Sequence, residues 1–165
     1  LTRILMFEFS EENREEFIMM FNNKLQEYRK IFYNAPIEDI SQSVGVGAYK
    51  KYVIEDEEHL ILGKQCPVSV HAIGRFNYLA HKNGEDSKRT YSGKIKYYNI
   101  ITGKEGKNPV IGYFGFPAGE LPDWAPPMHK QTQWKKNVID PINRFLEVMK
   151  IPLATSSSAI QLDLF

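Results

Sequence analysis

An amphipathic segment near the start of the chain places the strongest constraint on its fold. Between Phe17 and Phe32, large apolar residues recur every three or four positions, and polar residues fill most of the positions between them. This spacing puts the apolar side chains on one face of an α-helix, which must be buried against another part of the chain. Ser10 predicts the start of this helix. Asn34-Ala35-Pro36 predicts its end, because the residue before a proline avoids helical geometry.

The middle of the chain is typical of a small antiparallel sheet. Residues 93–102 alternate as a strand does, residues 103–108 indicate a turn, and residues 110–116 predict a second strand that pairs with the first. The prolines and glycines that follow predict an irregular connection. Residues 67–79 mix strand and helix signals, and residues 37–62 predict loops with a short strand or helix.

The C-terminal part returns to helical spacing. Apolar residues recur every three or four positions over residues 134–149, and Asp140-Pro141 predicts an N-cap followed by a first helical position, so that two helices meet there. A chain of 165 residues with 42% hydrophobic residues is long enough to bury a core. The predicted fold class is therefore α+β, with amphipathic helices at both ends framing a small antiparallel sheet. We expect one domain over residues 1–153 and a flexible tail over residues 154–165.

Charge is informative only locally. The formal net charge is +1, which by itself indicates neither a nucleic-acid partner nor a membrane partner. Residues 63–107, however, contain nine basic and three acidic side chains, an excess of six, whereas residues 31–62 contain two basic and six acidic ones. Tyrosines interleave with the basic residues of the middle segment. A surface that touches phosphates and sugars and an ordinary solvated face of a basic strand pair explain this pattern about equally well.

Motifs for catalysis or cofactor binding are not found in the sequence. Gly45-Val46-Gly47 lacks the third glycine of a dinucleotide fingerprint, and Ser92-Gly93-Lys94 lacks the upstream glycine and the Ser or Thr of a phosphate-binding loop. The aspartates and the four histidines are scattered, so no metal site is predicted. The single cysteine, Cys66, is interpreted as a small buried apolar residue.

The sequence also bears on the compartment of the protein. It has no apolar run near the roughly 18 residues that span a bilayer, and no basic-then-apolar leader. We therefore expect a soluble, intracellular protein without a membrane partner. Because the chain opens with Leu1, we also expect residues upstream of it in the natural gene.

Six segments form an ordered pattern along the chain: Lys51-Tyr52, Lys64–His71, Gly93–Lys96, Asn108-Pro109, Phe116–Pro122 and Trp134–Ile142. This pattern resembles the C-terminal part of the family B replicative DNA polymerase of T-even-like bacteriophages. The resemblance extends from the first helix to the last residue, and the order, the spacing and the end position together make it specific. In that family this region is the thumb, which grips the newly made primer–template duplex along its backbone and minor groove.

The resemblance implies the partners and the location of the chain. The palm, fingers and exonuclease of the polymerase would be partners, with Mg²⁺ bound in the palm and no cofactor on this chain. The chain would carry no catalytic residues of its own and would act in the cytoplasm of an infected bacterial host. The predicted DNA-binding residues, from matched positions or local basic context, are Lys50, Lys51, Tyr52, Lys64, His71, Arg75, Lys94, Lys96 and Lys136.

Three departures from the family pattern affect those residues. Gln65 stands where the family has lysine, with Lys64 one position earlier, and His71-Ala72 replaces the usual Arg-Gly. Asp140 stands where a second basic residue is typical, so only Lys136 carries over from that pair. Contacts with DNA would then be weakened or redistributed to Arg75.

The last five residues resemble a sliding-clamp peptide. Gln161-Leu162-Asp163-Leu164-Phe165 follows a Thr/Ser-rich tether and is similar to the Gln-Leu-x-Leu-Phe consensus of bacterial clamp binders. The resemblance implies that Leu162, Leu164 and Phe165 enter an apolar pocket of the phage clamp and that Gln161 orients the peptide.

Other interpretations of the chain stay open. Some phages divide this polymerase between two genes, so the chain is also compatible with a separately encoded small subunit. An unrelated DNA-binding module is a second alternative, and an unrelated small-molecule enzyme or interaction module is a third. A pocket that contains a pair of carboxylates would favour the enzyme.

Overall fold

The computed structural model describes residues 11–56, 58–85 and 92–151, and these residues form two compact units. The helical unit consists of the described residues before position 36 together with those from position 130 onward. The mixed unit consists of the described residues between 36 and 129. Ser10 and the predicted tail, 154–165, lie outside the described residues.

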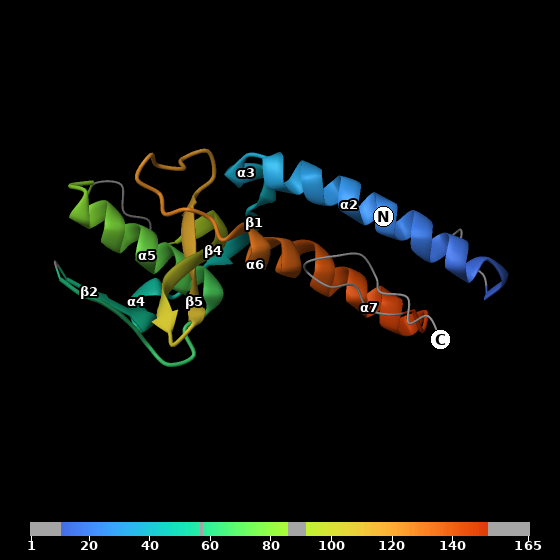
Figure 1. Ribbon diagram of the computed structural model, residues 1–165. Helices are drawn as coiled ribbons and strands as arrows, with labels where there is room; N and C mark the ends of the chain where they lie inside the picture. The colour runs from blue at the N-terminus through green and yellow to red at the C-terminus, as the bar shows by residue number, and fades with distance from the viewer. Residues whose placement is uncertain (1–10, 57, 86–91, 152–165) are drawn as a thin grey trace. The chain divides into compact units, whose positions relative to one another are not determined.

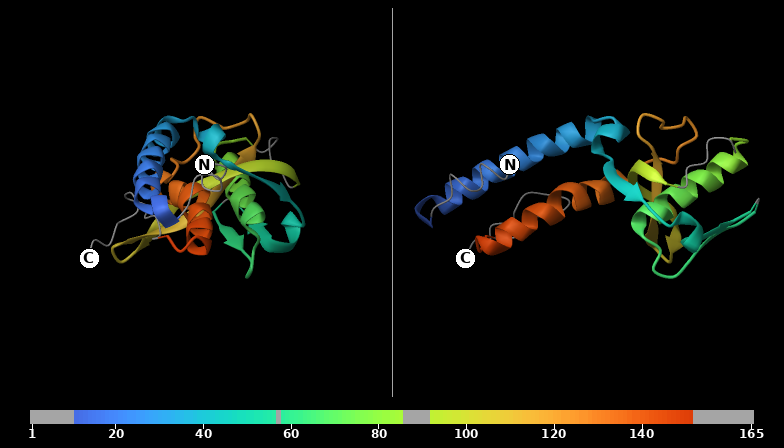
Figure 2. Two further views of the ribbon diagram at one scale, coloured as in Figure 1. Left: turned by 90° about the vertical axis from the view of Figure 1, so that its right-hand side faces the viewer. Right: turned by 180° about the vertical axis from the view of Figure 1, so that it is seen from behind.

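The helical unit pairs two helical runs. A 3-10 turn, η1 (Glu11–Asn13), leads into α2 (Arg14–Asn34). The second run consists of α6 (Lys130–Trp134), the π-helical η3 (Lys135–Ile139) and α7 (Asp140–Val148). Figures 1 and 2 show the two runs side by side. They are antiparallel, because Lys130 Nζ donates a 2.5 Å hydrogen bond to the carbonyl of Tyr33 and Arg14 Nη2 donates a 2.6 Å one to the carbonyl of Lys150.

The amphipathic pattern of α2 describes its buried face in part. Phe17, Ile18, Phe21, Leu25 and Phe32 are the buried residues of this helix. Tyr28 and Ile31 share the predicted spacing, but they are 41% and 64% exposed. The rings of Phe32 and Trp134 meet edge to face, with centroids 5.2 Å apart and planes at 66°. The helix ends where the sequence predicts, since Ala35 has extended backbone angles (φ −68°, ψ 149°) before Pro36.

The junction around Pro141 differs from the prediction. Asp140 has helical angles (φ −62°, ψ −43°), so it does not act as an N-cap between two separate helices. Instead α6, η3 and α7 follow one another without a break. Pro141 nevertheless lies in the first turn of α7, as the sequence predicts, where the missing N–H of proline is tolerated. The π-helical turn of η3 directly precedes it.

A three-stranded antiparallel sheet forms the centre of the mixed unit (Figure 1). Its strand order is β1 (Gln42–Val46), β4 (Gly93–Glu105) and β5 (Asn108–Pro117). Beyond the bulge between Ile101 and Gly103, the hairpin of β4 and β5 continues to the pair Glu105–Asn108. The turn therefore occupies two residues, where the sequence predicts a longer one.

The helix α5 (Val68–Lys82) packs on one face of this sheet, and it resolves the mixed signal of residues 67–79. Gly115 of β5 permits the close approach, because a Cβ at this position would lie 2.8 Å from Ile95 Cδ1 and 3.0 Å from Ala72 Cβ. Tyr98, Phe114 and Phe116 belong to the same buried core, with ring centroids of Tyr98 and Phe114 5.5 Å apart. Phe76 of α5 reaches this cluster, and its ring centroid lies 6.0 Å from that of Phe114.

Four short elements complete the mixed unit: α3 (Ile37–Ile40), α4 (Tyr49–Tyr52), β2 (Val53–Glu55) and β3 (Leu60–Leu62). The last two pair as an antiparallel ribbon, in which Val53 lies opposite Leu62. The side chains of these two residues contact α5 at Gly74, where a Cβ would lie 3.4 Å from Val53 and 3.5 Å from Leu62. The ribbon is thereby attached to α5.

The described chain is thus a mixed α+β protein with a small antiparallel sheet, as the sequence predicts. None of the described helices is both long enough and apolar enough to cross a membrane.

Candidate nucleic-acid interface

A backbone hydrogen bond at the base of the β2–β3 ribbon brings two predicted DNA-binding lysines near each other. The N–H of Gly63 donates a 2.7 Å hydrogen bond to the carbonyl of Tyr52. Lys51 directly precedes Tyr52, Lys64 directly follows Gly63, and both lysine side chains are exposed. These two cations are 13 positions apart in the sequence, and only the strand pairing places them at the same end of the ribbon.

The tyrosine between these lysines is fixed in place. Tyr52 is half-buried and packs against the core of the mixed unit. The ammonium of Lys51 lies 5.4 Å from the centroid of the Tyr52 ring. Lys50, which directly precedes Lys51 on α4, is also exposed. A rigid aromatic residue beside flexible cations resembles surfaces that contact the sugars and phosphates of nucleic acids.

The N-terminus of α5 lies next in the chain after Lys64. The helix begins at Val68, Pro67 occupies its N-cap position, and no side chain caps it. The first N–H groups of a helix lack partners within the helix, and the helix dipole adds a partial positive charge there. Phosphate groups bind readily at such helix ends. We refer to Lys50, Lys51, Tyr52, Lys64 and this first turn of α5 as the α4–α5 basic surface.

His71 and Arg75 lie on α5 but are directed toward protein. His71 is half-buried, and its ring meets that of Tyr113 edge to face, with centroids 5.5 Å apart. Burial, together with the nearby charge of Arg75, lowers the pKa of His71, and burial also lowers the pKa of Arg75. His71 Nδ1 and Arg75 Nε are buried and make no hydrogen bond within the described structure. The lowered pKa disfavours the charged form of His71, so this side chain is less suited than a lysine to neutralising a phosphate.

The two lysines of β4 differ in their surroundings. Lys94 is exposed and lies opposite Gly45 of β1. Lys96 is half-buried, and its Nζ donates a 2.8 Å hydrogen bond to the carbonyl of Glu38. The ammonium of Lys96 thus anchors α3 to the sheet in this structure, whereas that of Lys94 faces solvent.

The remaining predicted residues are not part of the α4–α5 basic surface. Lys136 belongs to η3 in the helical unit, where its side chain is half-buried. The predicted clamp-binding residues Gln161, Leu162, Leu164 and Phe165 lie outside the described residues.

Two further lysines occupy the end of the β4–β5 hairpin and were not singled out from the sequence. Lys104 is a residue of β4, and Lys107 belongs to the turn that Gly106 allows with its positive φ of 60°. All residues from Ile101 to Val110 are exposed. The local excess of basic residues included both lysines. What the sequence did not indicate is that the two strands continue far enough to carry them away from the core.

Features of an active site are scarce in the described part of the chain. No group of three His, Cys, Asp or Glu residues there is arranged to hold a metal ion. Burial raises the pKa of the Cys66 thiol, which disfavours the thiolate that a nucleophile requires. One pocket is lined by three carboxylates, those of Glu85, Glu120 and Asp123, which is more than the pair that would favour a small-molecule enzyme, so that alternative stays open.

No protein-family model matches this sequence, and a search of curated proteins finds no match. What the chain does must therefore be inferred from its residues and their geometry.

Proposed function

We propose that this chain binds duplex DNA through the phosphate backbone, as the thumb of a family B phage DNA polymerase, and that catalysis takes place on another part of that polymerase. The observation that carries this proposal is the α4–α5 basic surface. There Lys51 and Lys64 flank Tyr52 and Gly63, which are joined by a backbone hydrogen bond. The N-terminus of α5, which no side chain caps, follows Lys64 in the chain. Cations on a rigid frame are what a sequence-independent grip on phosphates requires.

The lysines of this surface suit a grip that ignores base sequence. A lysine ammonium acts as a point charge toward phosphate, whereas base-specific contacts are most often made by the bidentate groups of Arg, Asn or Gln. Lys104 and Lys107 would extend the same kind of contact along a duplex from the exposed end of the β4–β5 hairpin. A replicative polymerase must hold every sequence, so binding should be strongly dependent on salt and indifferent to sequence.

A binding titration with matched variants tests the proposal. Fluorescence anisotropy would be recorded with the full 165-residue chain and two unrelated duplexes at about 50 mM and about 200 mM salt. The variant Lys51→Ala/Lys64→Ala should bind both duplexes about tenfold more weakly at low salt. The slope of log K against log salt should become shallower by about 1.8, since each lost phosphate contact removes about 0.9.

The control is Lys24→Ala/Lys30→Ala, which removes the same charge from two exposed positions of α2. It should retain the affinity of the unmodified chain. An equal loss in both double variants would mean that net charge alone governs binding, and a marked preference for one duplex would contradict a sequence-independent grip.

We also propose that residues 161–165 bind a sliding clamp. The support is the terminal Gln-Leu-x-Leu-Phe pattern, in which Leu162, Leu164 and Phe165 supply about 1.5–3 kcal/mol each if fully buried. Ordering the tail offsets part of this gain, so a micromolar affinity is expected. A clamp that encircles the same DNA raises the local concentration of its binding site near the tail, so a modest affinity is enough to hold the two proteins together. Deletion of 162–165 from the complete polymerase should abolish clamp-stimulated synthesis and preserve synthesis without the clamp.

A separately encoded small subunit remains the alternative form of the same proposal. Tagged chain expressed in its natural context should then purify with a second protein that carries the palm. Recovery of the same residues only as the end of one long polypeptide would identify the chain as a domain of that polypeptide.

A further inference from the structure

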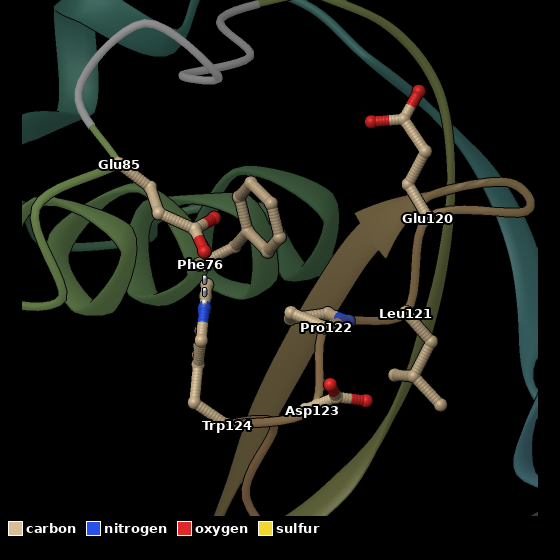
Figure 3. Close-up of a pocket in the computed structure, with 7 residues that line it drawn as sticks. All are labelled: Phe76, Glu85, Glu120, Leu121, Pro122, Asp123 and Trp124. Atoms are coloured by element: carbon tan, nitrogen blue, oxygen red, sulfur yellow. Dashed lines mark hydrogen bonds between the residues drawn. The ribbon is translucent and has the colours of Figure 1, made fainter.

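A pocket of about 390 Å³ opens between α5 and the segment that follows β5 (Figure 3). Its volume is at the lower end of the range of about 300–1,000 Å³ that is typical of small-ligand sites. The lining residues come from the side of α5, from the residues just after it, and from the segment after β5: Phe76, Glu85, Glu120, Leu121, Pro122, Asp123 and Trp124. The pocket shares no residue with the α4–α5 basic surface.

The lining combines negative charge with aromatic rings. Of the seven lining residues that the structure describes, Glu85, Glu120 and Asp123 are acidic and none is basic. Phe76 and Trp124 form the aromatic wall, with ring centroids 5.5 Å apart. In the view of Figure 3 the Phe76 ring lies between Glu85 and Glu120. Such a lining attracts a cation through the carboxylates and through the face of the partly exposed Trp124 ring, against which the buried Phe76 ring packs.

One of the carboxylates is held in a fixed orientation. The indole Nε1 of Trp124 donates a 3.0 Å hydrogen bond to Glu85 Oε1. This bond joins the residue just after α5 to the segment after β5 and thereby maintains one edge of the pocket. Glu120 and Asp123 are exposed, and no ion pair with another described residue neutralises either of them.

The geometry favours an organic cation over a metal ion. Among the residues that the structure describes, no three carboxylates, thiols or imidazoles converge closely enough to hold one metal ion. The three carboxylates of the pocket are instead spread around aromatic rings. A guanidinium is planar, stacks on an aromatic face and presents several N–H donors that can reach separate carboxylates, whereas a compact ammonium cannot do all three.

We propose that this pocket binds a guanidinium group. Two sources have this chemistry, namely a small guanidine compound and the arginine side chain of a protein partner. The proposal does not depend on DNA binding, because an acidic pocket repels phosphates and its residues are distinct from the basic ones. A negative result for guanidinium binding would therefore not count against DNA binding, and a negative result for DNA binding would not count against guanidinium binding.

Nuclear magnetic resonance on the full chain provides a direct test. The indole N–H signal of Trp124 reports on the pocket, because this group bonds to Glu85 within it. The probes are N-acetyl-arginine amide, a short neutral peptide with one central arginine, and N-acetyl-citrulline amide, which has the same shape without the charge. Both arginine probes should move the Trp124 signal saturably, and the citrulline probe should bind at least tenfold more weakly. A tighter complex with the peptide would identify a protein partner as the source, and equal or tighter binding of the amide would identify a small guanidine.

Matched variants complete the test. Glu120→Gln/Asp123→Asn should raise the Kd for both arginine probes at least tenfold, since it removes two charges from exposed positions of the lining. Glu58→Gln/Glu105→Gln, which removes the same charge from two exposed positions outside the pocket, should leave the Kd unchanged. The proposal is wrong if neither arginine probe binds more tightly than about 1 mM. It is equally wrong if citrulline binds as well as arginine, or if the two variants affect binding alike.

Discussion

The hydroxyl of Tyr98 donates a 2.7 Å hydrogen bond to the backbone carbonyl of Pro126. This bond joins the middle of β4 to the irregular segment after β5, which supplies five of the residues that line the acidic pocket. Tyr98 is fully buried, so its hydroxyl has no alternative partner in water. The position of the segment therefore depends on a polar contact as well as on aromatic packing.

Replacing Tyr98 with Phe should lower the free energy of unfolding by about 1–3 kcal/mol, because the carbonyl of Pro126 loses its partner while the ring remains. Tyr28→Phe is the matched control, since the Tyr28 side chain is 41% exposed and should tolerate the change. Urea denaturation of both variants measures the difference. Equal stabilities of the two variants would show that the bond contributes nothing net.

The same tyrosine should make the protein sensitive to alkali. Burial raises the pKa of Tyr98 above its ordinary value of 10.0. Below pH 10 the Tyr98 hydroxyl is protonated in both the folded and the unfolded chain, and its contribution to stability is fully present. Above pH 10 the hydroxyl ionises first in the unfolded chain, which favours unfolding, so that contribution is lost as pH rises. The free energy of unfolding should fall more steeply above pH 10 for the unmodified chain than for Tyr98→Phe. Parallel curves would contradict this.

His71 should have the opposite effect at acidic pH. Its pKa is lowered in the folded state by burial and by the charge of Arg75, so the unfolded chain takes up the proton first. Stability from this group is therefore present above the ordinary pKa of 6.5 and is lost as pH falls below it. The fall in unfolding free energy between pH 7 and pH 5 should be smaller in His71→Gln. His59→Gln, at an exposed position, should follow the unmodified chain.

The fold was most predictable where one local signal dominated. The helix that became α2 was predicted correctly because its apolar face repeats over several turns and Pro36 stops it. By contrast α5 is buried on several sides, because Ala72 and Gly74 are buried as well as Ile73 between them, so its buried residues do not form a single narrow stripe. The unbroken helical path through Pro141 also escaped prediction, because a proline signals a boundary and a π-helical turn has no sequence signature.

The candidate sites were less predictable because they depend on distant parts of the chain. Lys51 and Lys64 were both predicted, but their proximity follows from the pairing of β2 with β3, in a stretch where the sequence indicated loops. The structure also separates Lys96 from Lys94, although alternation alone made them equivalent. The acidic pocket unites Phe76 with Trp124 across 48 positions, and no local pattern marks such a contact.

Gly115 allows α5 to approach the sheet, and Gly115→Ala should therefore be destabilising. The new methyl group would lie 3.0 Å from Ala72 Cβ and 3.2 Å from the backbone of Ala72, which cannot move aside without moving the helix. We expect a loss of about 1–3 kcal/mol in the free energy of unfolding. Gly45→Ala is the control in strand β1, where nothing lies within 4 Å of an added Cβ. Similar stabilities of both variants would mean that the helix is not held at this distance.

The edge-to-face contact between Phe32 and Trp134 should contribute a measurable coupling to the helical unit. Aromatic pairs of this kind are worth about 0.5–1.5 kcal/mol beyond the area that they bury. A double-mutant cycle with Phe32→Leu and Trp134→Leu isolates that term, because each single variant keeps an apolar side chain in place. The control cycle uses Phe17 in place of Phe32 as the first position. Phe17 lies 15 residues earlier on α2, which places it about 22 Å away along the helix axis. Phe17→Leu and Trp134→Leu should be additive within about 0.5 kcal/mol. Additivity in both cycles would show that the Phe32–Trp134 contact is simple apolar burial without a specific ring interaction.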